Sequence, residues 1–372
     1  MLKHFEKLGR QRELYDAMLF RHKGQQIRFL PNGKCPFLSD NNLCNIQLQF
    51  GWEYMADICN MYPRRIFSSP RGLEFSLSLS CATAVHTLIQ PKITIERLHH
   101  EPHDQQNKAF YFIPPRTLEE YSPASAPLGS LRRHYYHVED LLLKLMQNRD
   151  YSLNQRLIAL GRVIELSVNY HNGDGENLTH SLHVALKNSD LTNIKANIRG
   201  NLQQLHFVIN SYLTRSAPTS GPPSPPSPPS AILPSTVTPF EKALELVRAK
   251  VMTLSYGEYG RQLARYYHPE NDVIPIILEN YLVNSILSKD FFFQVPPLAY
   301  YKMAFFYAIS IVFALGYCIE TDQTINQQIM LQAICDVENI FYQEWFYLHG
   351  TALLAEYGET RMMRNSIALV QF

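Results

Sequence analysis

The chain has 372 residues, of which 46% are apolar and 18% charged, a composition that excludes a disordered or fibrous protein. Its length is sufficient for a substantial apolar core, in one large domain or two. Lys and Arg number 34 against 33 Asp and Glu, for a net charge of +1, so charge does not indicate a nucleic acid or an acidic surface as partner.

The N-terminal stretch "MLKHFEKLGRQRELYDAMLF" carries charges throughout and contains no apolar run of signal-peptide length. We therefore expect a cytoplasmic protein, in which thiols stay reduced and disulfides are rare. The chain has six cysteines, and four of them fall in its first quarter: Cys35, Cys44, Cys59 and Cys81.

Residues 1–120 are predicted to form a cysteine-cluster region. Short β-prone runs such as "LEFSLSLSC" and "KITIERL" alternate with turns there. This small, irregular segment needs something other than a large apolar core, and a bound metal or cluster would meet that need.

The rest of the chain is predicted to be helical, because apolar residues recur at spacings of three and four. We expect a helical region over 121–215, a Pro/Ser-rich linker or loop over 216–239 and a C-terminal helical region over 240–372. The repeated Pro-Pro-Ser of the linker favours an extended, solvated segment. The predicted fold is thus mainly α, with a small cysteine-rich N-terminal segment of short strands followed by a multi-helix body.

Three local patterns sharpen this helical prediction. Ser152 is placed to cap a helix that starts after it, and Pro239 suits the first position of another. The uncharged stretch 303–319 is at the lower length limit for crossing a bilayer. We favour a buried core helix there over a membrane span.

The four early cysteines are separated by eight, fourteen and twenty-one residues. No CxxC pair is present, so neither the usual zinc-ribbon spacing nor the short iron–sulfur spacing occurs. Spacing alone therefore leaves two interpretations open, a shared metal or cluster site and four separate thiols packed as small apolar residues.

The residues around the thiols help to choose between these two interpretations. The stretch "CPFLSDNNLCNIQLQFGWEYMADICNMYPRR" and the later "GLEFSLSLSC" resemble the flagellin lysine-N-methylase family, and "ILENYLVNSIL" at 277–287 is similar to a later helical segment of that family. The matching residues are Cys35, Phe37, Leu38, Leu43, Cys44, Ile46, Gln47, Cys59, Tyr62, Pro63, Arg64, Glu74, Ser76, Leu77, Ser78 and Cys81.

The resemblance implies a cytoplasmic bacterial enzyme that transfers methyl groups from S-adenosylmethionine to lysine side chains of flagellin. It also implies that Cys35, Cys44, Cys59 and Cys81 hold an iron–sulfur cluster, expected as a four-iron cluster. No nucleic acid or membrane is expected as partner.

The chain departs from this family in one respect. Members carry a further cysteine motif of the C-x-x-x-C-C type upstream, whereas no cysteine precedes Cys35 here. We expect either a shortened N-terminus or a cluster built differently, since four thiolates are enough for a four-iron cluster.

Methylation of lysine requires a neutral amine, so the enzyme must desolvate the lysine or place a base beside it. Tyr62, Arg64 and Glu74 lie next to the cysteines and are candidates for binding donor or substrate, although aromatic packing or exposure to solvent explains each of them as well. No glycine-rich loop follows a strand, so a Rossmann-type donor site is not predicted, and the sequence indicates no catalytic residue.

Two further classes compete with the enzyme. One is a non-enzymatic protein in which a bound metal or cluster orders the N-terminal part while the helices bind a partner. The other is an inactive truncated homologue.

Overall fold

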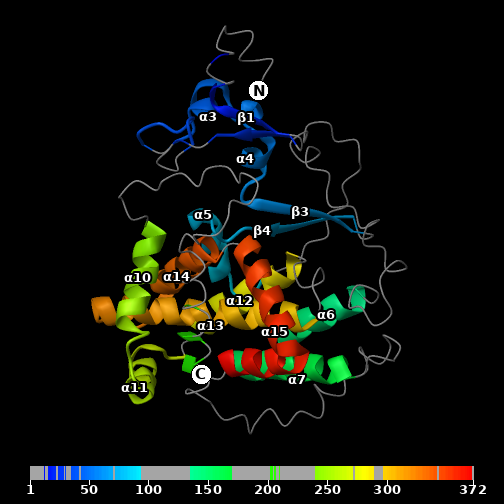
Figure 1. Ribbon diagram of the computed structural model, residues 1–372, viewed down its shortest axis with the longest axis vertical. Coiled ribbons are helices and arrows are strands. Elements are labelled where there is room, and N and C mark those ends of the chain that lie inside the picture. The colour runs from blue at the N-terminus through cyan, green and yellow to red at the C-terminus, as the bar shows by residue number, and fades with distance from the viewer. Residues whose placement is uncertain are drawn as a thin grey trace. The chain divides into compact units, whose positions relative to one another are not determined.

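The computed structural model describes residues 12, 16–21, 24–28, 30, 35–41, 43–69, 72–93, 135–169, 202–203, 205–206, 209, 239–270, 273–288, 296–341 and 343–370. Within these residues the chain is mainly helical, as predicted, with short antiparallel strands only in its first quarter (Figure 1). The linker predicted at 216–239 lies outside the described residues except for its last residue, and 94–134 lies entirely outside them.

The chain divides into two compact units. Unit 1 contains Met1–Tyr62 with Leu98–Pro114 and Pro218–Thr238, and unit 2 contains Pro63–Arg97, Pro115–Ala217 and Pro239–Phe372. The region boundaries predicted from the sequence stay predictions.

Unit 1 is small, and its elements are short. They are strands β1 (Met18–Arg21) and β2 (Gly24–Ile27), which pair antiparallel, followed by helices α3 (Asn45–Phe50), η1 (Trp52–Tyr54) and α4 (Asp57–Met61). Its buried core among the described residues consists of Ala17, Phe37 and Ile46, with Cys35 and Cys44 packed against it. So few buried apolar side chains give little stability on their own.

Unit 2 begins with a hairpin and continues as packed helices. Its elements are β3 (Arg64–Ser69), β4 (Gly72–Leu77), α5 (Ala82–Val85), η2 (His86–Ile89), α6 (Tyr135–Met146), α7 (Leu153–Asn169), α10 (Pro239–Lys250), α11 (Tyr256–Tyr266), α12 (Val273–Leu287), α13 (Pro296–Thr321), α14 (Gln327–Ile340) and α15 (Gln343–Leu369). β3 and β4 pair from Arg64 opposite Leu77 to Ser69 opposite Gly72. Helix α15 has one non-helical residue, Gly358.

The helix ends follow local sequence signals. Ser152 Oγ accepts a hydrogen bond from Gln155 N at 3.3 Å, which confirms it as the cap of α7. α10 begins at Pro239, as predicted. After α10 the chain turns, and Ser255 starts α11 with a reciprocal capping box to Glu258.

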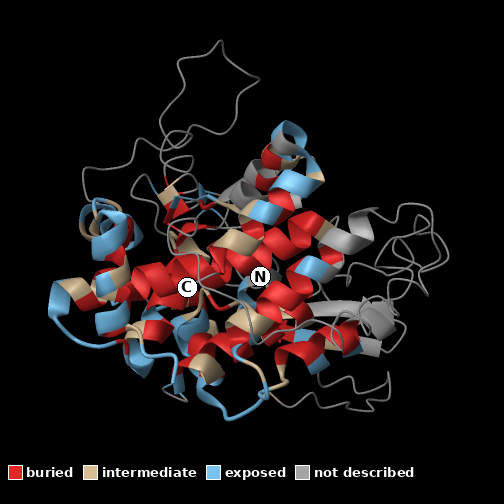
Figure 2. Cartoon of the chain, turned by 90° about the horizontal axis from the view of Figure 1, so that it is seen from below, coloured by how far each residue is buried: buried red, intermediate tan, exposed pale blue. Residues whose placement is uncertain are grey.

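Helix α13 is the centre of unit 2. It contains the apolar stretch 303–319, and nearly every residue from Pro297 to Cys318 is buried, which confirms the predicted core helix (Figure 2). By length and composition α13 is also apolar enough to cross a membrane, but 83% of its most apolar window is buried inside the protein. An apolar helix that is covered on all sides is typical of the interior of a large helical domain.

Two glycines allow neighbouring helices to approach α13 closely. A Cβ on Gly161 of α7 would lie 2.6 Å from the ring of Tyr300, whose hydroxyl donates to Leu157 O at 2.9 Å. A Cβ on Gly316 of α13 would lie 3.1 Å from Val247 of α10. Both contacts depend on the missing side chain, as expected where helices pack at short distance.

Asn280 of helix α12 holds the segment that follows the hairpin. The Nδ2 atom of this buried side chain donates to Leu88 O at 2.9 Å and to Gln90 O at 2.7 Å, and Oδ1 accepts from Ile93 N at 3.3 Å. One amide thus satisfies three backbone groups of η2 and its continuation, which have no secondary-structure partner there.

Asn284, one turn later on α12, forms hydrogen bonds with the backbone at the end of β4. Its Nδ2 donates to Leu77 O at 2.9 Å, and its Oδ1 accepts from Leu77 N at 3.2 Å. The asparagines of "ILENYLVNSIL" therefore fix the segment from Leu77 to Ile93 to the helical core.

Glu279 of α12 forms a buried ionic centre with two arginines. Its carboxylate, 2% exposed, accepts from Arg149 Nη2 and from Arg156 Nη1, each at 2.9 Å. Arg156 is 3% exposed and also donates to Met146 O, at the end of α6. The carboxylate joins α6 and α7 to α12, and the guanidinium groups balance its charge.

We predict that Glu279→Ala will destabilise the protein by about 3–5 kcal/mol, because it leaves a buried guanidinium without its counter-charge. Denaturant unfolding of the full chain measures this. Glu320→Ala is the matched control, since Glu320 pairs with Lys250 at 2.7 Å on the surface and should change stability by at most about 1 kcal/mol. Equal effects of the two substitutions would contradict the prediction.

Buried tyrosines should make the fold sensitive to alkali. Burial raises the pKa of Tyr259, Tyr300 and Tyr301 above their usual value, and that of Tyr267 to about 12. Above pH about 10 the unfolded chain loses these protons while the folded chain keeps them, so the free energy of unfolding must fall as pH rises.

Urea unfolding midpoints measured between pH 8 and 11, with tyrosinate absorbance recorded in parallel, test this prediction. The midpoint should fall above pH about 10, and the tyrosinate absorbance of the buried tyrosines should appear with unfolding. A midpoint that stays constant to pH 11, with full ionisation of tyrosine in the folded protein, is the contrary result.

Candidate functional site

A pocket in unit 2 lies where the β3–β4 hairpin meets α12, α13 and α14. The hairpin and the turn after it contribute Arg65, Leu77, Ser78 and Ser80, and α12 with the residue after it contributes Tyr281, Leu282, Asn284, Ser285 and Ser288. The remaining lining residues are Lys302, Met303, Phe306, Glu338 and Phe341. Charged, hydroxyl and aromatic groups therefore converge here on an apolar base, a composition typical of small-molecule sites.

A hydrogen bond between Tyr281 and Glu338 crosses the pocket wall. The hydroxyl of the buried tyrosine donates to Glu338 Oε1 at 2.7 Å. Burial, followed by the charge and the hydrogen bond of Glu338, raises the pKa of Tyr281 well above its usual value, whereas Arg65 lowers it. Tyr281 consequently stays a protonated donor and fixes the position of the carboxylate.

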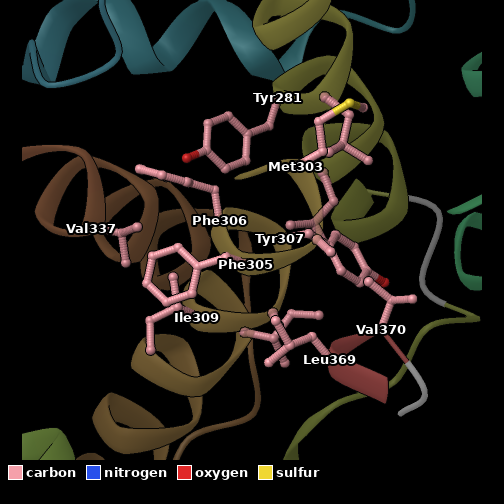
Figure 3. Close-up of a cluster of buried hydrophobic side chains, with 14 of the residues drawn as sticks. Tyr281, Met303, Phe305, Phe306, Tyr307, Ile309, Val337, Leu369 and Val370 are labelled. Carbon is pink, nitrogen blue, oxygen red and sulfur yellow. The ribbon is translucent and has the colours of Figure 1, made fainter. Parts of the chain in front are cut away.

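Lys302 is the charged residue of this pocket that comes from the core helix. It is 7% exposed, and its Nζ lies 5.9 Å from the centroid of the Phe306 ring. The ring face favours the ammonium electrostatically. Figure 3 shows Phe306 and Met303 of α13 lying close to Tyr281 of α12, on the side of the core that faces this pocket.

The turn after β4 is held by side chains of α14 as well as α12. Asn339 Nδ2 donates to Ser80 O at 2.9 Å, and Cys335 Sγ lies 3.6 Å from the same oxygen. Ser78 and Ser80 share a hydrogen bond of 2.9 Å between their hydroxyls. The rim of the pocket is therefore anchored to two helices.

In unit 1 a short loop brings Cys35 and Cys44 to the same small core. Leu38 and Cys44 form an antiparallel bridge, and Asn45 N donates to Phe37 O at 2.7 Å. The chain turns back between them, since Ser39 N donates to Leu43 O at 2.8 Å. The spacing of eight residues thus fits a folded-back loop and does not need the CxxC pattern.

Cys59, on α4, lies within electrostatic range of this pair. The surrounding protein partly desolvates its thiol, although the residue is exposed, and this raises its pKa; negative charge on Cys35 and Cys44 raises it further. Cys59 is therefore close enough to Cys35 and Cys44 to respond to their charge. Thiolates are the ligands that iron–sulfur clusters use, so the chemistry of the donor set fits such a group.

The separation of these side chains restricts the kind of metal group that they could bind. Among the described residues, no three His, Cys, Asp or Glu side chains are close enough together to hold a single metal ion. A cluster distributes its thiolate ligands over several iron atoms, so its ligands lie farther apart than those of one ion.

Cys81, the fourth predicted ligand, belongs to unit 2. It precedes α5, and its negative charge is among the causes that raise the pKa of Cys335 on α14, after burial and Asp336. Among the described residues, the thiol that lies near Cys81 is therefore that of Cys335. A shared site of all four predicted cysteines stays a prediction.

The three residues that the sequence analysis named as candidates for binding donor or substrate lie outside this pocket. Tyr62 ends unit 1 and is 49% exposed, Arg64 is exposed on β3, and Glu74 is half-buried on β4. None of the three lines the described pocket, whereas Arg65 does. Their assignment as donor-binding residues stays a prediction.

Comparison with known protein families gives one match. Residues 139–342, more than half of the chain, match the family described as FliB lysine N-methylase C-terminal domain. The chain belongs to the flagellin lysine N-methylase family. Comparisons with curated proteins and with solved structures gave no match.

The matched range determines which part of the site the family assignment covers. It includes α12, α13 and α14, and with them the pocket residues Tyr281, Lys302 and Glu338. The hairpin residue Arg65 and the four early cysteines precede it.

The sequence analysis did not identify Tyr281, Lys302 or Glu338, because they come from three separate helices. One signal was available: Lys302 is the single charged residue between Pro296 and Ile319. A lone charge in such an apolar helix must be neutralised or placed at a cavity, since burying it otherwise costs too much free energy.

Tyr281→Phe tests the hydrogen bond across the pocket. We expect it to lower stability by about 1–3 kcal/mol, because the carboxylate of Glu338 loses a donor in a partly buried place. Tyr256→Phe is the control: Tyr256 is 42% exposed and accepts from Gln203, so its change should stay within about 0.5 kcal/mol. Unfolding in denaturant measures both, and a Tyr281 variant as stable as the control would disprove the role.

Proposed function

We propose that this protein is a protein-lysine N-methyltransferase of the bacterial cytoplasm that methylates flagellin with S-adenosylmethionine as donor. The match to the lysine N-methylase family over 139–342 is the observation that carries the proposal. The resemblance of the cysteine-rich first quarter to the same family supports it from a separate part of the chain.

In the proposed reaction the neutral lysine nitrogen attacks the methyl carbon of the donor. The bond between that carbon and the sulfonium sulfur breaks, and S-adenosylhomocysteine leaves as a neutral thioether. The ammonium form of lysine must lose its proton before the attack, to a nearby base or to water. Aromatic rings of the protein favour the cationic sulfonium and the methylated ammonium.

We further propose that Cys35, Cys44 and Cys59 are ligands of an iron–sulfur cluster, with Cys81 as the fourth. When bound, the cluster would link the loop at 35–44 to α4 and so stabilise a unit whose described core is very small. The same thiols must be deprotonated to bind iron, so loading should be favoured at higher pH.

Reconstitution under anaerobic conditions tests the cluster and the activity together. Full-length protein supplied with iron and sulfide should bind iron and acid-labile sulfide and show charge-transfer absorbance. With S-adenosylmethionine and flagellin, the flagellin mass should then rise in steps of one methyl group. Bound iron without methyl transfer would favour the non-enzymatic cluster protein instead.

Cysteine variants locate the ligands. Changing Cys35, Cys44 or Cys59 to Ser should remove most of the bound iron, as measured by iron content and absorbance. Cys318→Ser is the control, because Cys318 is buried in α13 and belongs to unit 2. Unchanged iron content in all three unit 1 variants would exclude these ligands.

A further inference from the structure

The turn after β4 brings two cysteines of unit 2 together. Cys81 directly precedes α5 and Cys335 lies on α14, and these two helices contact each other (Figure 1). The Sγ atom of Cys335 lies 3.6 Å from Ser80 O. Because this oxygen belongs to the peptide group that joins Ser80 to Cys81, the sulfur of Cys335 contacts the peptide group next to the Cα atom of Cys81.

Asn339 of α14 holds this arrangement in place. Its Nδ2 atom donates to Ser80 O at 2.9 Å and to Cys335 O at 2.8 Å, so it ties the turn to the part of α14 that carries the thiol. Burial, then Asp336 and then the charge of Cys81 raise the pKa of Cys335, which places the two thiols within electrostatic range. Bridged cysteines have Cα atoms about 4.4–6.8 Å apart, a separation that elements packed in contact supply.

The two thiols differ in their access to solvent. Both are free, Cys81 is half-buried, and Cys335 is only 7% exposed. A small oxidant therefore reaches Cys81 first, with Cys335 beside it to react with the product. Disulfides are rare in a cytoplasm, and those that form there are usually transient and redox-sensing. An accessible thiol with a second thiol next to it is the arrangement that such sensors use.

We propose that Cys81 and Cys335 form a redox pair, which a peroxide converts to a disulfide and a thiol reductant restores. The thiolate of Cys81 attacks one oxygen of hydrogen peroxide, the O–O bond breaks, hydroxide leaves, and Cys81 becomes a sulfenic acid. The sulfur of Cys335 then attacks that of Cys81. The S–S bond forms, the S–O bond breaks, and the departing hydroxide takes the proton of the Cys335 thiol as water. In total, two thiols lose two electrons and one peroxide becomes two water molecules.

The disulfide would remove Cys81 from the proposed cluster. Iron is bound by a thiolate, and a sulfur that is bonded to another sulfur is no longer one. The oxidised protein would therefore offer only the thiols of unit 1 until it is reduced. This consequence rests on the proposed function, in which Cys81 is the fourth ligand, whereas the disulfide itself does not.

Peptide mass spectrometry of the metal-free full-length protein tests the pair. Brief treatment with hydrogen peroxide, followed by iodoacetamide and digestion, should give a linked peptide that contains Cys81 and Cys335 and disappears after treatment with dithiothreitol. Cys318→Ser is the control, since Cys318 is buried in α13, and it should keep the linked peptide. If Cys335 stays free in the oxidised protein, or Cys81 is linked to another cysteine, the pair is wrong and the proposed function is unaffected.

Iron loading separates the pair from the ligand assignment. After anaerobic reconstitution, Cys335→Ser should keep the iron and sulfide content of the unmodified protein, because Cys335 is a partner for oxidation and not a ligand, whereas Cys81→Ser should lower both. Loss of iron in Cys335→Ser would make Cys335 a ligand and overturn the proposal. Full iron content in Cys81→Ser, with the linked peptide present in the unmodified protein, would support the pair and remove Cys81 from the proposed cluster.

Discussion

The arrangement of unit 2 depends on polar side chains carried by a helix that is otherwise apolar and buried. On α12, Glu279 is neutralised by Arg149 and Arg156, and Asn280 and Asn284 take up backbone groups between Leu77 and Ile93. A buried amide that lost these partners would cost free energy, so this segment is held in a single favoured register. Tyr281, between the two asparagines in sequence, is thereby directed to α14.

The pocket of unit 2 depends on this docking, whereas the thiols of unit 1 do not. The pocket exists because Asn284 holds the end of β4 beside α12, which places Arg65 opposite Lys302 and Glu338 around one space. The thiols of unit 1 lie instead on local turns around Phe37 and Ile46, and the apolar core beside them is small among the described residues. The cluster proposed for these cysteines would add stability to a unit whose described core is small.

Local sequence signals predicted the elements and missed the pocket, for a physical reason. Ser152, Pro239 and the apolar run 303–319 act within one or two helical turns, so the helices they indicate were confirmed. The pocket requires residues 65, 281, 302 and 338 to meet, and no local pattern encodes which faces of separate helices turn toward one another. The division after Tyr62 was likewise not foreseen, because the cysteine motif runs through it without a change in composition.

The extent of the apolar surface on α13 has a consequence for how this domain can be produced. The family match ends at residue 342, yet Leu353, Met363 and Leu369 of α15 belong to the same buried core. Figure 3 shows Leu369 in this core. Because α15 packs on α13 and follows it in the chain, one side of α13 remains uncovered until α15 has been synthesised. A fragment cut at the limits of the family match would keep that side exposed permanently and would be prone to aggregate or to associate with membranes. The folding unit of this protein is therefore longer than its recognisable homology region.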